Sequence, residues 1–565
     1  MANEQLEKDL NRPIQRLLQV INLERKEIGS IYFYAILAGL LQLAVPLGVQ
    51  AIINFVLAGR LSTSIVVLIV LVVFSVFATG LLQVNQMKIT EKIQQRLFTR
   101  YSFEFAWRIP RLDLKMIDGY YLPEFVNRFF DTINLEKSLS KLLLDIPAAL
   151  IQVLFGLILL SLYANIFIIF SLLLLLIIFL IIRFSYKKGL STSLEESDRK
   201  YQVAGWLEEI ARVLKSFQFS RGSLLPVSKT DELVTKYLHA RTRHFQVLLK
   251  QYWALIGFKV VITAGMLIVG ALLLVGNEIN VGQFAAAEIV IISVLASVEK
   301  LIKSIEKIYD VLTSVEKLGK VIDKPLEADG TLGIQDDGKG VSINVQDLTF
   351  SYNDKTNILQ HVTFHVNAGE KVCITGGDGS GKSTLLKLLT GSYSDFKGAI
   401  TINQVPIDNY NSLLLRSETG ILFHQQDIFE GTLYENITLG DTQITPAEIT
   451  QLANKLGIGD FIILLKHGFD THIDAAGKRL SSAVMRKVLL LRALLSKPKL
   501  LLLEEPWLGF DKDCREKVQH YLLHEIPETT VLLITNETAF VQKCDRIVEI
   551  QDGTVVKQGK PNQTL

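Results

Sequence analysis

The clearest chemical signal in the sequence is a glycine-rich stretch, residues 371–389, KVCITGGDGSGKSTLLKLL. It places an apolar strand, a glycine turn and the start of a helix in series, with the spacing G-x-x-x-x-G-K-[ST]. Glycines lack a Cβ atom, so their N–H groups can surround a phosphate at a helix N-terminus. The stretch therefore predicts a nucleotide-binding site made by Gly376, Gly377, Asp378, Gly379, Ser380, Gly381, Lys382, Ser383 and Thr384.

Two of these residues have defined chemical tasks in such a loop. Lys382 is expected to reach the β and γ phosphates, and the Ser383 hydroxyl can ligate Mg²⁺. Further along, the apolar run LLLLEEP ends in two acids, Glu504 and Glu505. At a strand end beside a phosphate loop, one acid can join the metal shell and the other can orient attacking water. Glu504 is the expected metal-shell residue and Glu505 the expected base.

The elements around this site alternate in type. Short β-branched runs such as VSINV, KVCIT, AITIN and TVLLIT are separated by helical stretches, which is typical of an α/β domain with a largely parallel sheet. We expect this domain at residues 341–565. It follows a glycine-rich, charged linker at residues 326–340.

The first half of the chain differs from this α/β domain in its long apolar runs. Apolar runs long enough to cross a bilayer occur near residues 31–58, 65–86, 143–162, 166–183, 253–275 and 283–303. They predict an all-α transmembrane domain of six helices at residues 31–325, after a polar cytoplasmic segment at residues 1–30 that lacks signal-peptide features. With 49% apolar residues in 565, a soluble kinase or GTPase does not fit the chain.

Basic residues fix the expected orientation. The long segments after the second and fourth spans are dense in lysine and arginine, whereas the other loops share only Arg60. The positive-inside rule then places the long segments and both termini in the cytoplasm. Among polar residues within the spans, Glu288 is a candidate for lining a wet cavity or for a structural contact.

Charge and cysteine content exclude other classes. The net charge of +2 gives no basic surface for nucleic acid. The three cysteines, Cys373, Cys514 and Cys544, have no CxxC spacing, so we expect reduced buried thiols rather than a disulfide or zinc site.

Six spans followed by this phosphate site resemble the ATP-binding cassette exporters over essentially the whole chain. The membrane part is similar to bacterial type I secretion exporters without a peptidase domain. The resemblance implies a half-transporter of the bacterial inner membrane, in contact with membrane lipid, that binds ATP and Mg²⁺ and works as a homodimer or heterodimer. The exported substrate is not implied by any residue.

The same resemblance assigns further residues. Tyr352 in FSYND matches the aromatic residue that stacks on adenine. Gln425, or alternatively Gln426, in FHQQDIFEG matches the glutamine that links the metal site to the helices. Short elements near residues 111–122 and 208–220 resemble the coupling helices that dock on the cassette.

Four positions depart from the family pattern. The signature, usually LSGGQ, reads LSSAV from Leu480, so that only Ser481 remains of its polar contacts to ATP. Glu504 stands for the metal-shell aspartate, Asn536 for the switch histidine, and Ala475 for a glutamate that communicates with the coupling helices.

Each family site combines one subunit's phosphate loop with the other's signature, so both contributions are altered here. The sequence predicts ATP binding with slow hydrolysis in an exporter. A non-transporting, ATP-gated scaffold or regulatory subunit is the alternative.

Overall fold

The computed structural model describes residues 2–59, 63–117, 121–220, 222–327, 329–334, 338–352, 356–424 and 428–561. The chain divides into two compact units. Unit 1 comprises Met1–Pro110 and Tyr120–Lys324, and unit 2 comprises Arg111–Gly119 and Pro325–Leu565.

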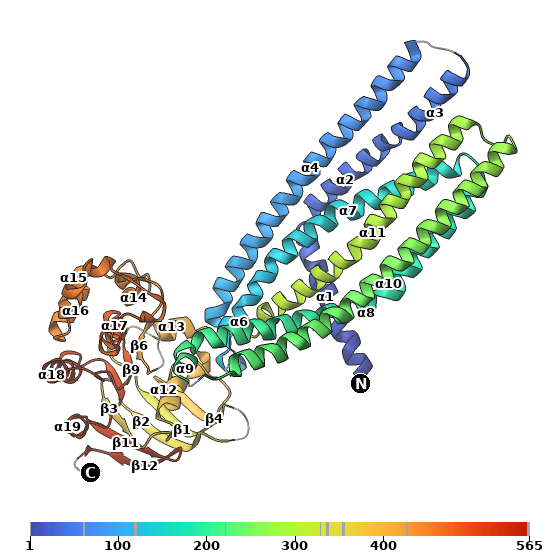
Figure 1. Cartoon of the computed structure of the whole chain (residues 1–565). Helices are drawn as coiled ribbons and strands as arrows, with labels where there is room; N and C mark the ends of the chain where they lie inside the picture. Colours follow the sequence, from blue (N-terminus) through green and yellow to red (C-terminus); the bar gives the residue numbers. More distant parts are fainter. Residues whose placement is uncertain are drawn as a thin grey trace. The chain divides into compact units, whose positions relative to one another are not determined.

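Unit 1 is helical (Figure 1). Its helices are α1 (Ala2–Leu23), α2 (Arg25–Gln42), α3 (Ala44–Leu57), α4 (Thr63–Arg108), α6 (Leu122–Val126), α7 (Asp131–Ser161), α8 (Ile166–Arg212), α9 (Leu214–Gln218), α10 (Leu225–Val275) and α11 (Val281–Ile322). A short 3₁₀ segment, η2 (Asn127–Phe130), precedes α7. The long helices α4, α8, α10 and α11 run well beyond the apolar stretches they contain, as expected for spans with helical extensions.

Several helices can cross a membrane. Five described segments meet the length and hydropathy that a span requires: Arg25–Leu57, Thr63–Arg111, Leu122–Ser161, Leu225–Val275 and Val281–Ile322. The fourth expected span coincides with a shorter apolar stretch of α8, Ile166–Leu180. The first expected span is not one continuous helix, because α2 ends at Gln42 and α3 begins at Ala44, with Pro46 in its first turn.

Packing separates a protein-facing side from an outward side. Helix α11 packs on α7 and α10 packs on α8, and their contact faces form a core that includes Leu160, Phe258 and Val294. On α4, Phe74 and Phe77 are 63% and 62% exposed. Large apolar side chains in such positions are stable against hydrocarbon rather than water.

Glu288 lies on α11 within the last apolar stretch. Its Oε1 atom is buried and has no hydrogen-bond partner among the residues that the structure describes. The expectation that this carboxyl group lines a cavity or makes a structural contact therefore stays open.

Unit 2 is built on two main sheets (Figure 1). One is antiparallel with the order β2-β1-β4-β5, and the other has the order β12-β11-β3-β10-β9-β6. The strands are β1 (Ile343–Phe350), β2 (Leu359–Val366), β3 (Lys371–Thr375), β4 (Lys397–Ile402), β5 (Val405–Pro406), β6 (Thr419–Leu422), β9 (Leu500–Glu504), β10 (Thr530–Ile534), β11 (Arg546–Gln551) and β12 (Thr554–Gly559). A short pair, β7 (Gly431–Thr432) and β8 (His472–Ile473), completes the strands.

The helices of unit 2 are short. They are α5 (Leu114–Ile117), α12 (Lys382–Leu389), α13 (Ser412–Ser417), α14 (Leu433–Thr438), α15 (Pro446–Lys455), α16 (Asp460–Leu464), α17 (Ser482–Leu495), α18 (Lys512–His520) and α19 (Thr538–Val541). The remaining short segments are η3 (Ile407–Asn409), η4 (Gly468–Asp470), η5 (Ala475–Gly477) and the π-helical turn η6 (Tyr521–Glu525).

The larger sheet lies between two hydrophobic cores. Because side chains alternate along a strand, Leu501 and Leu503 of β9 join a core with α14, α15, α17 and α18, while Leu500 and Leu502 join a core with β1, β2 and α12. All four leucines are fully buried. A strand buried on both faces reads as a continuous apolar run, which explains the LLLLE pattern.

The described first part of the short element expected near residues 111–122, residues 111–117, packs within unit 2. Leu112 pairs with Leu326, and the Glu327 N–H donates to the carbonyl oxygen of Arg111 at 2.9 Å. Lys115 of α5 forms an ion pair with Asp395. This segment of the helical half is therefore held by the α/β unit itself.

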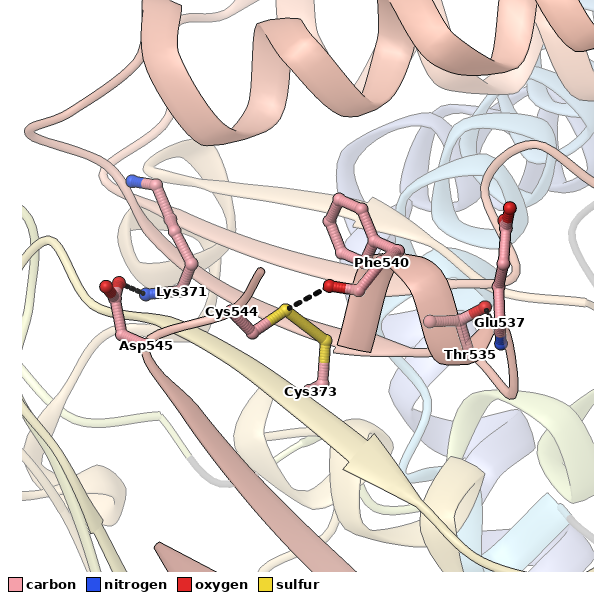
Figure 2. Close-up of a disulfide and its surroundings, with 7 residues drawn as sticks. All are labelled: Lys371, Cys373, Thr535, Glu537, Phe540, Cys544 and Asp545. Carbon is pink, nitrogen blue, oxygen red and sulfur yellow. Dashed lines mark hydrogen bonds between the residues drawn. A yellow bond between two sulfur atoms is a disulfide. The ribbon is translucent and has the colours of Figure 1, made fainter. Parts of the chain in front are cut away.

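The expectation of three reduced cysteines is wrong for two of them. The structure joins Cys373 of β3 to Cys544, which precedes β11, in a disulfide (Figure 2). Cys514 is a free cysteine. β3 and β11 are neighbouring parallel strands, so the two Cα atoms lie 6.4 Å apart, within the range that a disulfide spans. A separation of 171 residues leaves no local spacing signal for this pairing.

Candidate nucleotide-binding site

The candidate site lies at one edge of the larger sheet of unit 2. Strands β3, β10, β9 and β6 are parallel neighbours, so their carboxyl ends meet at that edge. This is where ligands bind in open α/β sheets. The phosphate loop follows β3, the two glutamates lie at the end of β9, and Thr535 and Asn536 follow β10.

The phosphate loop depends on glycine at two positions. Gly376 has a φ of 141°, and a Cβ atom there would lie 2.0 Å from the carbonyl oxygen of Ile550. Gly381 has a φ of 99°, and a Cβ atom would lie 2.7 Å from the Leu359 side chain. Both conformations are costly for any other residue. The loop can therefore keep its backbone N–H groups available only with glycine at these positions.

Lys382 is held inside the loop. It is the first residue of α12, is 9% exposed, and its ammonium group donates to the carbonyl oxygens of Gly376 at 2.8 Å and Gly377 at 2.6 Å. A third contact, at 3.3 Å, reaches the Ser380 hydroxyl. The positive charge is thus positioned at the mouth of the loop before any phosphate is bound.

Ser383 and Glu504, the two residues expected in the metal shell, lie in direct contact. The Ser383 hydroxyl donates to Glu504 Oε1 at 2.5 Å, and the backbone N–H of His424 donates to Glu504 Oε2 at 3.0 Å. Hydroxyl and carboxylate oxygens are ligands that suit Mg²⁺. This ion binds few protein groups and fills the rest of its coordination shell with water and phosphate oxygens. Within the described ranges, no cluster of three or more His, Cys, Asp or Glu side chains forms an alternative metal site.

Glu505 lies beside the switch position. Its carboxylate accepts hydrogen bonds from the Thr535 hydroxyl and from the backbone N–H of Asn536, both at 3.3 Å. Its φ of 43° is unusual for a residue with a side chain, and its own N–H donates to the Ile534 carbonyl at 2.9 Å. Burial raises the pKa of the Glu505 carboxyl group, although these two hydrogen bonds oppose the rise.

Tyr352, matched by resemblance to the adenine-stacking residue, lies next to α12. Its hydroxyl donates to Thr384 Oγ1 at 3.2 Å. Its ring packs edge-on against Phe350, at 5.0 Å between centroids, and Tyr393, at 5.5 Å. The fold therefore brings Tyr352 to the phosphate loop's helix. In the same loop Asp378 is exposed.

The segment LSSAV, residues 480–484, leads into α17. Ser481 is the N-cap residue, and its hydroxyl accepts a hydrogen bond from the Val484 N–H at 3.2 Å. Val484 is half-buried against the apolar core of the α/β unit. Val484 thus has a packing role in this chain.

Two residues of the site, Arg486 and His424, were missed from the sequence. Arg486 of α17 is 7% exposed, and its guanidinium donates to the Glu504 carbonyl oxygen at 3.2 Å and lies 3.4 Å from His424 Nδ1. Burial lowers the pKa of Arg486, while Glu504 and Glu505 favour its charged form. The stretch MRKVLLLRALL holds three basic residues, Arg486, Lys487 and Arg492, so the sequence does not single out Arg486.

Gln425 and Gln426 lie outside the described residues, so their expected role stays a prediction. Ala475 begins the short η5 segment, whose next residue, Ala476, donates its N–H to the Ile428 carbonyl at 3.0 Å. No role follows for Ala475 from these contacts.

The class of protein follows from the two units. A P-loop with a serine–glutamate pair at the edge of a parallel sheet is a nucleotide-binding domain, and it follows a domain of helices long and apolar enough to span a membrane several times.

Comparisons with known proteins specify this class. Residues 359–508 match the family model "ABC transporter". The chain is 29% identical over 223 residues to "Uncharacterized ABC transporter ATP-binding protein YknV" of Bacillus subtilis, covering 40% of this chain and 37% of that protein. It is 30% identical over 331 residues to "Antigen peptide transporter 1" of Rattus norvegicus, covering 56% and 44%. It is 30% identical over 223 residues to "ATP-dependent lipid A-core flippase" of Saccharophagus degradans, covering 40% and 38%.

These alignments span less than half of each relative's length. A solved structure, "Structure of a bacterial Atm1-family ABC exporter with ATP bound", matches 96% of both chains with a TM-score of 0.86 at 19% identity. The chain therefore carries an ABC transporter domain and has the whole-chain fold of an ABC exporter.

Proposed function

We propose that this chain is one half of an ATP-binding cassette exporter that moves a substrate across a membrane as a dimer, with slow ATP hydrolysis. One observation carries the proposal: a single chain with an exporter fold contains both a P-loop site and helices long and apolar enough to span a membrane. Multi-pass membrane insertion follows from the helices, and we place the protein in a bacterial inner membrane with the α/β unit in the cytoplasm.

The site's own residues suggest how ATP is held. Lys382 and the loop N–H groups bind the β and γ phosphates, and Thr384 and Tyr352 lie at the start of α12 where the rest of the nucleotide approaches. Ser383 and Glu504 would hold Mg²⁺, which neutralises phosphate charge when bound. Glu505 is positioned to orient water, with Asn536 next to it.

Weak hydrolysis is inferred from the same residues. Asn536 cannot carry the charge that a histidine would bring to the γ phosphate. Val484 has no hydrogen-bonding side chain, and Ser482 and Ala483 add side chains where the family pattern has glycines. Losing one hydrogen bond to a charged group costs about 1.5–3 kcal/mol, or about one to two powers of ten in affinity.

In a dimer that pairs one subunit's loop with the other's signature, a conforming partner would still leave one altered contribution in each site. This makes the rival function, an ATP-gated scaffold or regulatory subunit without transport, the natural second candidate. The retained Glu505 and its contacts with Thr535 and Asn536 favour the exporter.

Phosphate release and bound nucleotide should be measured for the full chain in lipid nanodiscs. The comparison set is wild type, Glu505→Gln, and a repaired variant with Ser482→Gly, Ala483→Gly, Val484→Gln and Asn536→His. We expect tight ATP binding with slow release in wild type and faster release on repair.

Transport is tested separately, by measuring ATP-dependent uptake of candidate substrates into inside-out vesicles. Wild-type release far above that of Glu505→Gln would contradict slow hydrolysis and support an autonomous pump. Bound ATP without uptake, in the presence of every partner subunit tested, would instead favour the gating role.

A further inference from the structure

Unit 1 contains two adjoining cavities between α7, α8, α10 and α11. The larger has a volume of about 950 Å³ and the smaller about 590 Å³. Leu248, Tyr252, Glu306 and Lys307 line both, so the two cavities are continuous. Volumes of this order suit a small organic molecule.

The smaller cavity is basic. It is lined by two acids, Asp145 and Glu306, and by four lysines. The lysines are Lys141, Lys300, Lys303 and Lys307. Three of these lysines belong to α11 at spacings of three and four residues, which places them on one face of the helix. Together they form a cationic stripe directed at the cavity.

Each α11 lysine of the stripe has an acidic partner. Lys300 contacts Asp145 at 2.8 Å, Lys303 contacts Glu299 at 2.6 Å and Lys307 contacts Asp310 at 2.9 Å. The lysine side chains of these pairs are 31% to 53% exposed, and the acids are 16% to 38% exposed. Ion pairs that water reaches are modest in strength, so an incoming anion can compete with an acid partner for a lysine.

The larger cavity has an apolar wall on α10. Leu238, Phe245, Leu249 and Tyr252 line it, and Phe245 is 59% exposed. They precede the apolar stretch expected at residues 253–275, in a polar part of the helix where hydrocarbon would not cover them. The Lys303 ammonium lies 5.6 Å from the centre of the Tyr252 ring, which joins the apolar wall to the cationic stripe.

The larger cavity is balanced in charge. Its acids are Asp131, Glu196, Glu306 and Asp310, and its bases are Lys137, Lys200, Arg241 and Lys307. Asp131 accepts a hydrogen bond from the Tyr201 hydroxyl at 2.7 Å, and Glu196 pairs with Arg241 at 2.7 Å. The smaller cavity, with four lysines against two acids, therefore carries the excess positive charge of the space.

We propose that the two cavities form one binding site for an amphipathic organic anion. Its apolar body lies on the Phe245 and Tyr252 wall, and its carboxylate, sulfonate or phosphate group is held by Lys300, Lys303 and Lys307. The proposal rests on the export function above and names its substrate class. An anionic lipid headgroup and a small organic acid share this chemistry, and the experiment distinguishes them.

The test is equilibrium dialysis of the full chain in phosphatidylcholine nanodiscs, without nucleotide, against empty nanodiscs. The probe is 1-pyrenebutyrate, and its matched cation is a pyrenebutyl trimethylammonium salt. We expect saturable binding of the anion and no excess binding of the cation. Equal binding of both probes would overturn the proposal.

Charge removal localises the site. The variant Lys300→Gln/Lys303→Gln/Lys307→Gln should lower anion affinity by at least about tenfold, because each lysine near the ligand contributes about fivefold and three are removed together. Lys236→Gln removes an exposed lysine of α10 that lines neither cavity and should change the affinity less than about twofold. An unchanged affinity in the triple variant would refute the site.

Two further arms complete the design. Phe245→Ala keeps every charge and should lower pyrenebutyrate affinity severalfold, which tests the site even if the triple variant does not fold. Adding phosphatidylglycerol should compete with the probe if the natural ligand is a lipid headgroup, and should not compete if it is a small acid.

The outcome is independent of the proposed export. Charge-selective binding without ATP-dependent uptake of the probe into vesicles would leave the site standing and remove the export function. Uptake that the triple variant retains in full would remove the site and leave export.

Discussion

Replacing Glu504 by glutamine tests the proposed metal site most directly. The Glu504 carboxylate accepts two hydrogen bonds, from the Ser383 hydroxyl at 2.5 Å and from the His424 N–H at 3.0 Å. A glutamine amide carries no charge; its oxygen can still accept from the His424 N–H, while its NH₂ group can donate to the Ser383 hydroxyl, which also accepts hydrogen bonds. The substitution therefore removes the negative charge from these contacts while conserving size.

The magnitude follows from these contacts. A hydrogen bond to a charged group is worth about 1.5–3 kcal/mol, which corresponds to about 10-fold to 150-fold in a binding constant. We expect the Mg²⁺ concentration that half-saturates metal-dependent ATP binding to rise by that factor in Glu504→Gln. Binding of ATP without metal should rise slightly, because a negative charge near the phosphates is lost.

The assay is a Mg²⁺ titration of the fluorescence of bound trinitrophenyl-ATP, with the full chain in nanodiscs. Glu504→Asp is the matched control, since it keeps the charge and shortens the side chain by one methylene group. It should retain most of the metal affinity. An unchanged Mg²⁺ midpoint in Glu504→Gln would refute the assignment of Glu504 to the metal shell.

Three further predictions follow from other contacts. Burial raises the pKa of Glu505, and a base acts only when deprotonated, so phosphate release should fall on acidification at a higher pH than for an ordinary carboxylate. A pH profile without this acidic fall, or the same fall in Glu505→Gln, would contradict the role of Glu505 as the base. Arg486→Met should slow phosphate release at least about tenfold, because the Glu504 carbonyl and His424 lose their contacts with the guanidinium. Arg486→Lys should restore part of the rate. Equal release by wild type, Arg486→Met and Arg486→Lys would make Arg486 a packing residue only. Maleimide labelling of the denatured chain should count one thiol without reductant and three after reduction, whereas three thiols in both samples would show that Cys373 and Cys544 are reduced.

The nucleotide site could be predicted from the sequence because its signals are local. The P-loop spacing fixes glycine at Gly376 and Gly381, where the backbone conformation excludes other residues. The apolar run before Glu504 and Glu505 identifies a strand buried on both faces, and its end must lie at the ligand edge of a parallel sheet. The spans were equally visible, because a length of apolar sequence is itself the signal.

The remaining features depend on contacts between distant segments. Nothing near Arg486 in the sequence indicates that its guanidinium meets the end of β9 and His424, two residues after β6, since this depends on how α17 packs on the sheet. The break between α2 and α3 at Leu43 was missed because both halves are apolar. The Cys373–Cys544 pair was missed because the parallel pairing of β3 with β11 brings together residues far apart in the chain.

The contacts at the start of α17 bear on the stability of the repaired variant. Val484 packs against the core, and Ser481 satisfies the Val484 N–H as an N-cap, so the segment is locally stable as it stands. A glutamine at position 484 would place a polar amide at a half-buried position, which is unfavourable unless a phosphate or another acceptor meets it. If this segment limits hydrolysis, as we propose, the repaired variant should gain turnover while losing some stability.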